Sequence, residues 1–140
     1  MNQPDQYLFV YGSLRQGFQS PAYDYISRYF EFVSMGKTKG VLYDLGTYPV
    51  AVPDKKDNYI IGELYRLKKA EEFDWAFAQL DDYEGVIVEE DETPLYHRKK
   101  TIVHTDHGDV DSWVYWYNGV VKNKNIITSG DLLQYMKEKK

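Results

Sequence analysis

The run Tyr7–Tyr11 is the sequence feature that most constrains the fold of this chain. Five consecutive apolar or aromatic residues lead directly into Gly12-Ser13. A run of this length and composition predicts a buried strand rather than a helix. Gly12 permits a tight turn or a close approach to its backbone. A buried strand that ends in an open Gly-Ser loop directs backbone N–H groups toward a ligand, so we expect the rest of the chain to build a pocket around this strand end.

The size of the chain predicts a single domain over residues 1–140. Hydrophobic residues make up 43% of its 140 residues, which is enough to form a core. The sequence contains no cysteine, so disulfides, thiolate catalysis and cysteine-based zinc sites are excluded. This usage fits a reducing compartment, and we expect a cytoplasmic location.

The charge balance argues against two classes of partner. The formal net charge is −5, whereas nucleic-acid and anionic-membrane binders present a basic face. No apolar run approaches the roughly 20 residues that a membrane-spanning helix needs. We therefore expect neither a nucleic-acid partner nor a membrane.

Strands dominate the expected secondary structure. Helices are expected over 21–30, where Ser20-Pro21 provides a start signal, over 70–82, where apolar residues recur at helical spacing, and within 128–139. Residues 32–34 are expected as a short strand and 36–40 as a turn or a bulged strand start. The remaining strands are expected over 41–45, 50–53, 59–67, 101–104 and 110–117. Few of them alternate with crossover helices, which favours an α+β fold with a mixed, mostly antiparallel sheet, open or curled into a small barrel.

The strand over 110–117 has two distinct faces. Trp113, Tyr115 and Tyr117 share one face, and Val114 and Trp116 share the other. The chain has 14 tyrosines, a residue that fills a core and also suits a pocket wall, because it buries a ring and keeps a hydroxyl.

Nucleophile and metal chemistry find little support in the sequence. Ser13 and the three histidines do not form a Gly-x-Ser-x-Gly elbow, so a serine hydrolase is a minor alternative. His104 and His107 lie in an expected hairpin turn, where their side chains face water rather than a shared metal ion. No glycine-rich phosphate loop is present.

Two carboxylates stand apart from the charged runs. Glu84 follows the apolar stripe of the second helix and precedes Gly85, which is a helix stop. A partly buried glutamate has a raised pKa, near that of a general base at neutral pH. Glu63 lies within an apolar strand. Because side chains alternate between the two faces of a strand, we favour an outward-facing Glu63 over an inward-facing one.

A set of short motifs occurs in a fixed order along the chain. They are Tyr11-Gly12-Ser13-Leu14-Arg15, Gly46-x-Tyr48-Pro49, Gly62-Glu63-Leu64-Tyr65, Leu80-Asp81-x-x-Glu84-Gly85, Tyr96-x-Arg98 and the closing aromatic strand. This ordered set, which spans about residues 7 to 118, resembles the γ-glutamylcyclotransferase-like family, including the γ-glutamylamine cyclotransferases and AIG2-like proteins.

The resemblance implies a small mixed β-barrel with two or three flanking helices and a cofactor-free reaction. It implies that Tyr11, Gly12, Ser13 and Leu14 cradle the α-amino acid end of a γ-glutamyl group and that Glu84 is the general acid/base. The implied substrate is a γ-glutamyl amine or a γ-glutamyl amino acid. It cyclises by intramolecular acyl transfer, which is a lyase-type reaction, and the products are 5-oxoproline and the free amine. Tyr48, Pro49 and Tyr115 would line the pocket.

Several points stay open at this stage. Alternation does not choose between Tyr115 and Tyr117, and Arg98 either pairs with an acid or supports the sheet. The hydroxyl of Ser13 is expected to be incidental, because its backbone N–H is the useful group. Acidic residues 89–92 hint at a cationic leaving amine. The main alternative function is an inactive relative that binds a small amino-acid-like ligand, and an unrelated hydrolase or interaction domain is the third.

Overall fold

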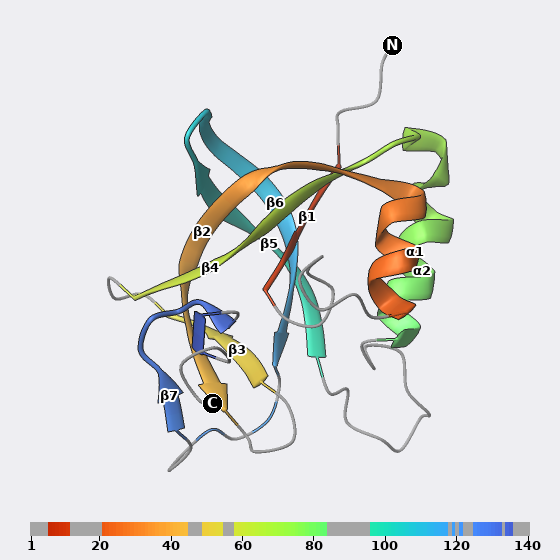
Figure 1. Cartoon of the computed structure of the whole chain (residues 1–140). Helices are drawn as coiled ribbons and strands as arrows, with labels where there is room; N and C mark the ends of the chain where they lie inside the picture. The colour runs from red at the N-terminus through yellow and green to blue at the C-terminus, as the bar shows by residue number, and fades with distance from the viewer. Residues whose placement is uncertain are drawn as a thin grey trace.

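A computed structural model describes residues 6–11, 21–44, 49–54, 58–83, 96–117, 119, 121, 125–132 and 134–135. The description of residues 21–23, 49 and 81–83 is limited to their backbone. Seven strands, two α-helices and one 3₁₀ turn lie in this part of the chain (Figure 1). In chain order they are β1 (Tyr7–Val10), α1 (Pro21–Tyr29), β2 (Phe30–Asp44), β3 (Pro49–Pro53), β4 (Tyr59–Leu67), η2 (Ala70–Glu72), α2 (Phe73–Tyr83), β5 (Tyr96–Thr105), β6 (Gly108–Tyr117) and β7 (Asn125–Ile127).

Five strands close into a mixed barrel. The strand order is β3-β2-β4-β1-β6-β5, and a further pairing of Lys37 with His104 joins β2 to β5. The β1–β6 pairing is parallel, whereas the other pairings are antiparallel. The expected α+β fold with a small, mostly antiparallel barrel is therefore confirmed. β3 and β7 pair with one end of β2 outside this closed circuit.

Of the two alternatives expected for 36–40, a turn or a bulged strand start, the turn is wrong, because these residues lie inside β2. β2 is one continuous strand of 15 residues, with a bulge between Phe32 and Ser34. Gly36 serves close packing rather than a turn, because a Cβ there would lie 2.7 Å from Val103 Cγ1 on β5. The glycine thus marks the point where β2 crosses β5 and the barrel closes.

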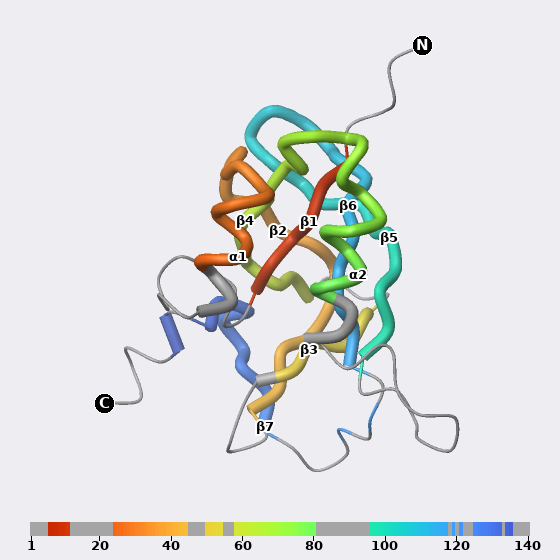
Figure 2. The backbone as a smooth tube through the Cα atoms, turned by 90° about the vertical axis from the view of Figure 1, so that its right-hand side faces the viewer, coloured from red at the N-terminus to blue at the C-terminus, as the bar shows by residue number. Residues whose placement is uncertain are grey.

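The two α-helices lie together on one side of the barrel (Figure 1). The first expected helix is confirmed as α1, and the second begins with η2 before it continues as α2. The Tyr25 hydroxyl on α1 donates a 2.9 Å hydrogen bond to the Ala76 carbonyl on α2. Figure 2 shows the helices with β1 visible between them. Neither helix is long and apolar enough to cross a membrane, nor is any other helix in the ranges given above.

The core has two parts, one on each face of the sheet. The helix-side core lies between the sheet and the helices, and the barrel core fills the interior. The predicted alternation of β6 is confirmed, since residues 113, 115 and 117 belong to the first part and 114 and 116 to the second. The helix-side core contains Leu8, Val10, Ile26, Phe30, Val50, Tyr65, Leu67, Ala76, Phe77, Leu80, Tyr96 and Tyr115, and the barrel core Phe9, Tyr11, Leu42, Ala51, Ile60, Leu64, Val103, Val114, Trp116, Ile127 and Leu132.

Strand lengths differ from expectation at the C-terminal half. β5 and β6 each have 10 residues and form a long hairpin around a turn at 106–107. β7 was not predicted, because its three residues offer too short a pattern to detect. Of the expected final helix, residues 132 and 134–135 are helical within the described positions.

Candidate functional site

The end of β1 is tied to β6 through a buried tyrosine. The Tyr11 hydroxyl donates a 2.7 Å hydrogen bond to the backbone carbonyl of Tyr115. Both residues are buried, and β6 is the strand that runs parallel to β1. This bond fixes where the chain leaves β1, immediately before Gly12.

Tyr115 and Tyr117 lie on the same face of β6, as expected. Tyr115 is buried, whereas Tyr117 is half-buried and packs against the helix-side core. Tyr96 on β5 pairs in register with Tyr117, and their ring centroids lie 5.8 Å apart. The assignment of Tyr115 rather than Tyr117 to a pocket wall stays a prediction.

Glu63 on β4 is buried, so the outward-facing position that the sequence favoured is wrong. Only 3% of its surface is exposed, and Oε1 accepts a 2.8 Å hydrogen bond from the Tyr65 hydroxyl. The physical reason is the place of β4 in the closed barrel. Around Glu63 both faces of β4 are covered by the two parts of the core, so alternation there does not place this side chain in solvent.

Arg98 on β5 connects α2 to the hairpin through aromatic rings. Its guanidinium lies 4.5 Å from the ring centroid of Trp113 on β6 and 4.9 Å from that of Phe77 on α2. A cation above aromatic faces is attracted by their quadrupoles, and Phe73 adds a third ring at 5.9 Å. These contacts with rings on α2 and β6 support the structural role for Arg98.

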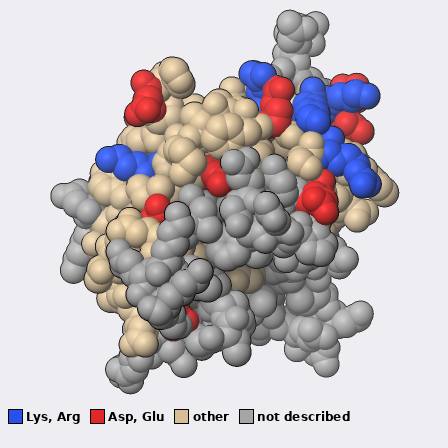
Figure 3. Space-filling model, in the orientation of Figure 1, with Lys and Arg blue, Asp and Glu red and all other residues tan. Residues whose placement is uncertain are grey.

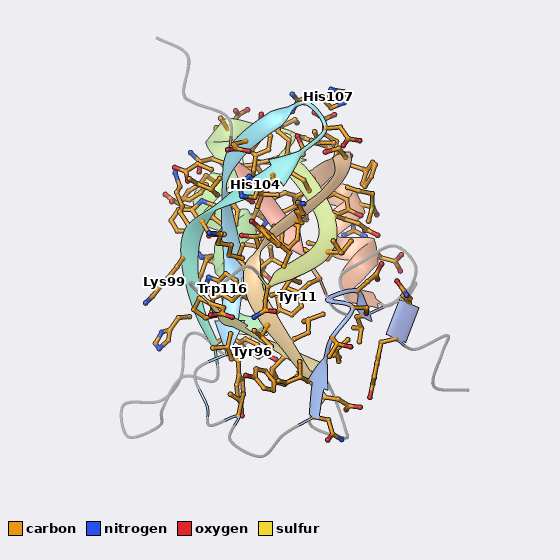
Figure 4. All side chains as sticks on the ribbon, turned by 90° about the vertical axis from the view of Figure 1, so that its left-hand side faces the viewer. Tyr11, Tyr96, Lys99, His104, His107 and Trp116 are labelled. Carbon is orange, nitrogen blue, oxygen red and sulfur yellow. The ribbon has the colours of Figure 1, made fainter. Side chains whose placement is uncertain are left out.

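His104 and His107 lie away from the end of β1. Figure 4 shows His104 and His107 on the β5–β6 hairpin near its tip and Tyr11 and Tyr96 toward the other end. His104 Nδ1 lies 2.7 Å from Asp109 Oδ1, an exposed pair. Over the residues with a described position, no group of three His, Asp or Glu side chains is arranged to hold a metal ion.

Several predicted site residues lie outside the described residues. These are Gly12, Ser13, Leu14, Tyr48 and Glu84. Pro49 is the first residue of β3 and pairs in register with Asp44 at the end of β2. The Asp44 carboxylate accepts a 2.7 Å hydrogen bond from the Tyr135 hydroxyl, which ties the C-terminal segment to the end of β2.

Electrostatics on the described surface are mixed rather than of one sign. Figure 3 shows acidic and basic side chains interspersed on the face viewed. Among the described residues, the pKa of Tyr25 is raised to about 12, mainly by burial and in addition by the neighbouring Tyr29 and Glu72. Tyr25 is therefore the neutral hydrogen-bond donor that joins α1 to α2 at any pH near neutrality.

Comparison with known proteins decides the family. The family model for γ-glutamyl cyclotransferases of the AIG2-like type matches residues 8–134. The chain belongs to this family.

Two known proteins resemble the chain over nearly its full length. The curated protein MJ1514 of Methanocaldococcus jannaschii, whose γ-glutamylcyclotransferase name is provisional, is 29% identical over 136 residues, covering 93% of this chain and 98% of that protein. The solved structure of ytfP from Escherichia coli is 28% identical with a TM-score of 0.61, and the match covers 94% of this chain and 99% of ytfP.

Two further structures extend the comparison of the fold. YkqA from Bacillus subtilis has a TM-score of 0.69 and 25% identity; the match covers 98% of this chain but 44% of YkqA, so this chain spans less than half of that protein. A mouse AIG2-like protein has a TM-score of 0.63 at 20% identity, covering 86% of this chain and 82% of the mouse chain. The latter likeness bears on the fold alone.

The sequence analysis did not predict that Glu63 is buried and hydrogen-bonded to Tyr65. A usable signal was present in β4, where Tyr59–Leu67 is almost continuously apolar. A strand with that pattern is buried on both faces, which leaves no solvent side for Glu63.

Proposed function

We propose that this protein is a cofactor-free γ-glutamylcyclotransferase. It converts a γ-glutamyl amine or γ-glutamyl amino acid into 5-oxoproline and the free amine, with Glu84 as general acid/base. The observation that carries the proposal is the family match over residues 8–134, which includes the end of β1 and the Leu-Asp-x-x-Glu-Gly motif.

The reaction needs little more than a folded substrate and a proton carrier. The α-amine of a γ-glutamyl amide reaches its own γ-carbonyl and closes a five-membered lactam. A neutral amine is required for attack, so Glu84 accepts the amine proton. The C–N bond to the leaving amine then breaks, and Glu84 returns the proton to the departing nitrogen. Because nucleophile and electrophile share one molecule, orientation supplies much of the rate.

Backbone groups after β1 hold the substrate in this proposal. The N–H groups of Gly12, Ser13 and Leu14 bind the α-carboxylate or the developing oxyanion. The hydrogen bond from Tyr11 to the Tyr115 carbonyl supports this role, because it anchors the residue directly before the loop. Tyr48, Pro49 and Tyr115 are the proposed pocket walls.

The second helix supports the role of Glu84. α2 ends at Tyr83, one residue before the proposed base. Ala76, Phe77 and Leu80 pack in the helix-side core, and the Arg98 guanidinium lies over the Phe77 ring. These contacts hold α2, the helix that precedes Glu84 in the chain, against the sheet.

The alternative is a catalytically weak or inactive relative that binds a small amino-acid-like ligand. Retention of Glu84 argues against it, since a pure binding protein has little use for a base at that position.

An assay of 5-oxoproline release tests the proposal. The protein is incubated with a panel of γ-glutamyl amines and γ-glutamyl amino acids that differ only in the leaving group. Turnover of at least one member is expected. If no member reacts while a γ-glutamyl compound binds, the inactive-relative alternative replaces the enzyme.

A further inference from the structure

The sheet face that α2 covers continues as an exposed surface beyond the helix. Arg98 on β5 lies on this face, because its guanidinium contacts rings on α2. Alternate residues of a strand share one face, so Ile102 and His104 share the face of Arg98. Asp111 and Asp109 on β6 pair in register with Ile102 and His104. Ile102 is 53% exposed and both carboxylates are exposed, so this part of the hairpin presents an apolar side chain beside two acids.

β2 forms the other side of this surface. Lys37 pairs in register with His104 at the point where the barrel closes. Thr38 is buried, so its neighbours Lys37 and Lys39 face outward, and both are exposed. The antiparallel register places Lys39 beside Ile102. The surface is therefore basic on β2, apolar at the middle strand and acidic on β6. It is termed the closure face below and consists of Lys37, Lys39, Ile102, His104, Asp109 and Asp111.

The opposite charges at the two sides of the closure face are only partly used within the molecule. The Lys37 ammonium lies 4.8 Å from the Tyr59 ring centroid and forms no ion pair with another described residue. Asp109 Oδ1 lies 2.7 Å from His104 Nδ1, which leaves Oδ2 for another donor. Asp111 forms no hydrogen bond or ion pair with a described residue. Because β5 separates the basic side from the acidic side, each side is open to a partner of opposite charge.

A second copy of the closure face has the charges that complement it. In an isologous interface the same surface of both subunits meets across a two-fold axis. An axis along β5 places β2 of one copy over β6 of the other and β5 over β5. Lys37 of each copy then faces Asp109 of the other. Lys39 faces Asp111 in the same way, and Ile102 packs on its own counterpart at the axis. Stacked sheet faces lie about 10 Å apart, a distance that these side chains bridge.

We propose that the closure face forms a two-fold dimer between copies of this chain. The contact covers three strands about 4.8 Å apart, a footprint of a few hundred Å², below the roughly 800 Å² per partner of a standard stable interface. The dimer is therefore transient, with a dissociation constant of about 10–500 µM. Lys100, the next residue along this face of β5, lies over the Trp113 ring rather than on the axis. The inference is independent of the proposed function, since the closure face lies away from the end of β1 (Figure 4).

Sedimentation velocity of the wild type tests the dimer first. Over a concentration range from about 10 µM to about 1 mM, the weight-average sedimentation coefficient is expected to rise from that of a monomer toward that of a dimer. A wild type that stays monomeric over the whole range overturns the proposal.

Exchange of charges tests the arrangement of the two copies. Lys37→Glu and Asp109→Lys each place like charges opposite one another in the homodimer, so each is expected to weaken association by about tenfold or more. In an equimolar mixture of these two variants, opposite charges meet again at both pairs of the heterodimer. The mixture is therefore expected to associate within about threefold of the wild type. The double variant Lys37→Glu/Asp109→Lys is expected to recover the homodimer for the same reason.

Two exposed residues on the helix side of the molecule provide matched controls. Lys69→Glu has the same net charge as Lys37→Glu, and Glu71→Lys has the same net charge as Asp109→Lys. Lys69 and Glu71 lie at η2 and are exposed, so both controls are expected to dimerise as the wild type does. Asp109→Asn keeps a polar group beside His104, and a smaller loss of about two- to fivefold is expected for it.

The outcomes separate the closure face from other modes of association. Recovery of association in the mixture supports the proposed axis, because neither variant can form the pair by itself. A wild-type dimer that both charge reversals leave unchanged shows that the copies meet through another surface and overturns the proposal. Two weakened variants whose mixture and double variant both stay monomeric overturn the pairing of Lys37 with Asp109.

Discussion

The Tyr11 hydroxyl and the Tyr115 carbonyl, 104 residues apart in the sequence, are joined by a buried 2.7 Å hydrogen bond. The bond links the end of β1 to β6 at the residue that precedes Gly12. It connects the packing of the barrel to the residue after which the proposed substrate-binding residues begin.

Tyr11→Phe tests this connection. Loss of a buried hydroxyl bond is expected to lower the free energy of unfolding by about 1–2 kcal/mol, measured by urea denaturation. The KM for a γ-glutamyl substrate is expected to rise, because the exit of β1 is less firmly held. Tyr7→Phe, at the start of the same strand, is the control, with an expected change below about 0.5 kcal/mol. Equal effects of both variants would contradict a special role for Tyr11.

Arg98→Met tests the link between α2 and the hairpin. The variant keeps the length of the side chain but removes the cation that lies above Trp113 and Phe77. A loss of about 1–2 kcal/mol in stability is expected, together with a fall in kcat that exceeds the change in KM, because α2 leads to Glu84.

Lys100→Met is the matched control for Arg98. Lys100 is exposed on the same strand, and its ammonium lies 5.2 Å from the Trp113 ring. An exposed contact of this kind contributes little, so a stability change below about 1 kcal/mol and an unchanged kcat are expected. A kcat effect as large as that of Arg98→Met would argue against positioning through α2.

Tyr25→Phe tests the helix–helix contact through its pH dependence. Because burial raises the pKa of Tyr25 to about 12 from its ordinary value of 10.0, the folded state favours the neutral hydroxyl. Its contribution is fully present below pH 10 and is lost as the pH rises through about 12. The stability advantage of the wild type over Tyr25→Phe is therefore expected to shrink between those values in denaturant titrations, and a constant difference would contradict it.

The elements that the sequence predicts well are those whose signal is local. The apolar run of β1 and the alternation of β6 both reflect which face each residue presents, and the structure confirms them. The start of α1 is also predicted locally, because Ser20-Pro21 is a typical start signal for a helix. Barrel closure is different, because it depends on the β2–β5 pairing between residues far apart in the chain.

Two misses have the same physical origin. Gly36 resembles a turn residue in isolation, but it lies in β2 because Val103 packs too closely for a side chain there. Glu63 resembles an outward-facing residue of an alternating strand, but β4 has a core on both faces. Both outcomes depend on partner elements in the closed barrel; the local pattern does not reveal them at Gly36, whereas the almost continuously apolar β4 does carry a signal for Glu63. The remaining predicted site residues stay predictions, since Gly12, Ser13, Leu14, Tyr48 and Glu84 lie outside the described positions.

The measurement that tests the account most directly is 5-oxoproline release by the wild type and by Glu84→Gln, with Ser13→Ala beside them. Glu84→Gln keeps the shape of the side chain and removes the base, so a loss of at least about a hundredfold in kcat is expected with unfolding stability near that of the wild type. Ser13→Ala keeps the backbone N–H and is expected to retain activity within a few-fold of the wild type. A Glu84→Gln variant as active as the wild type would contradict the central claim.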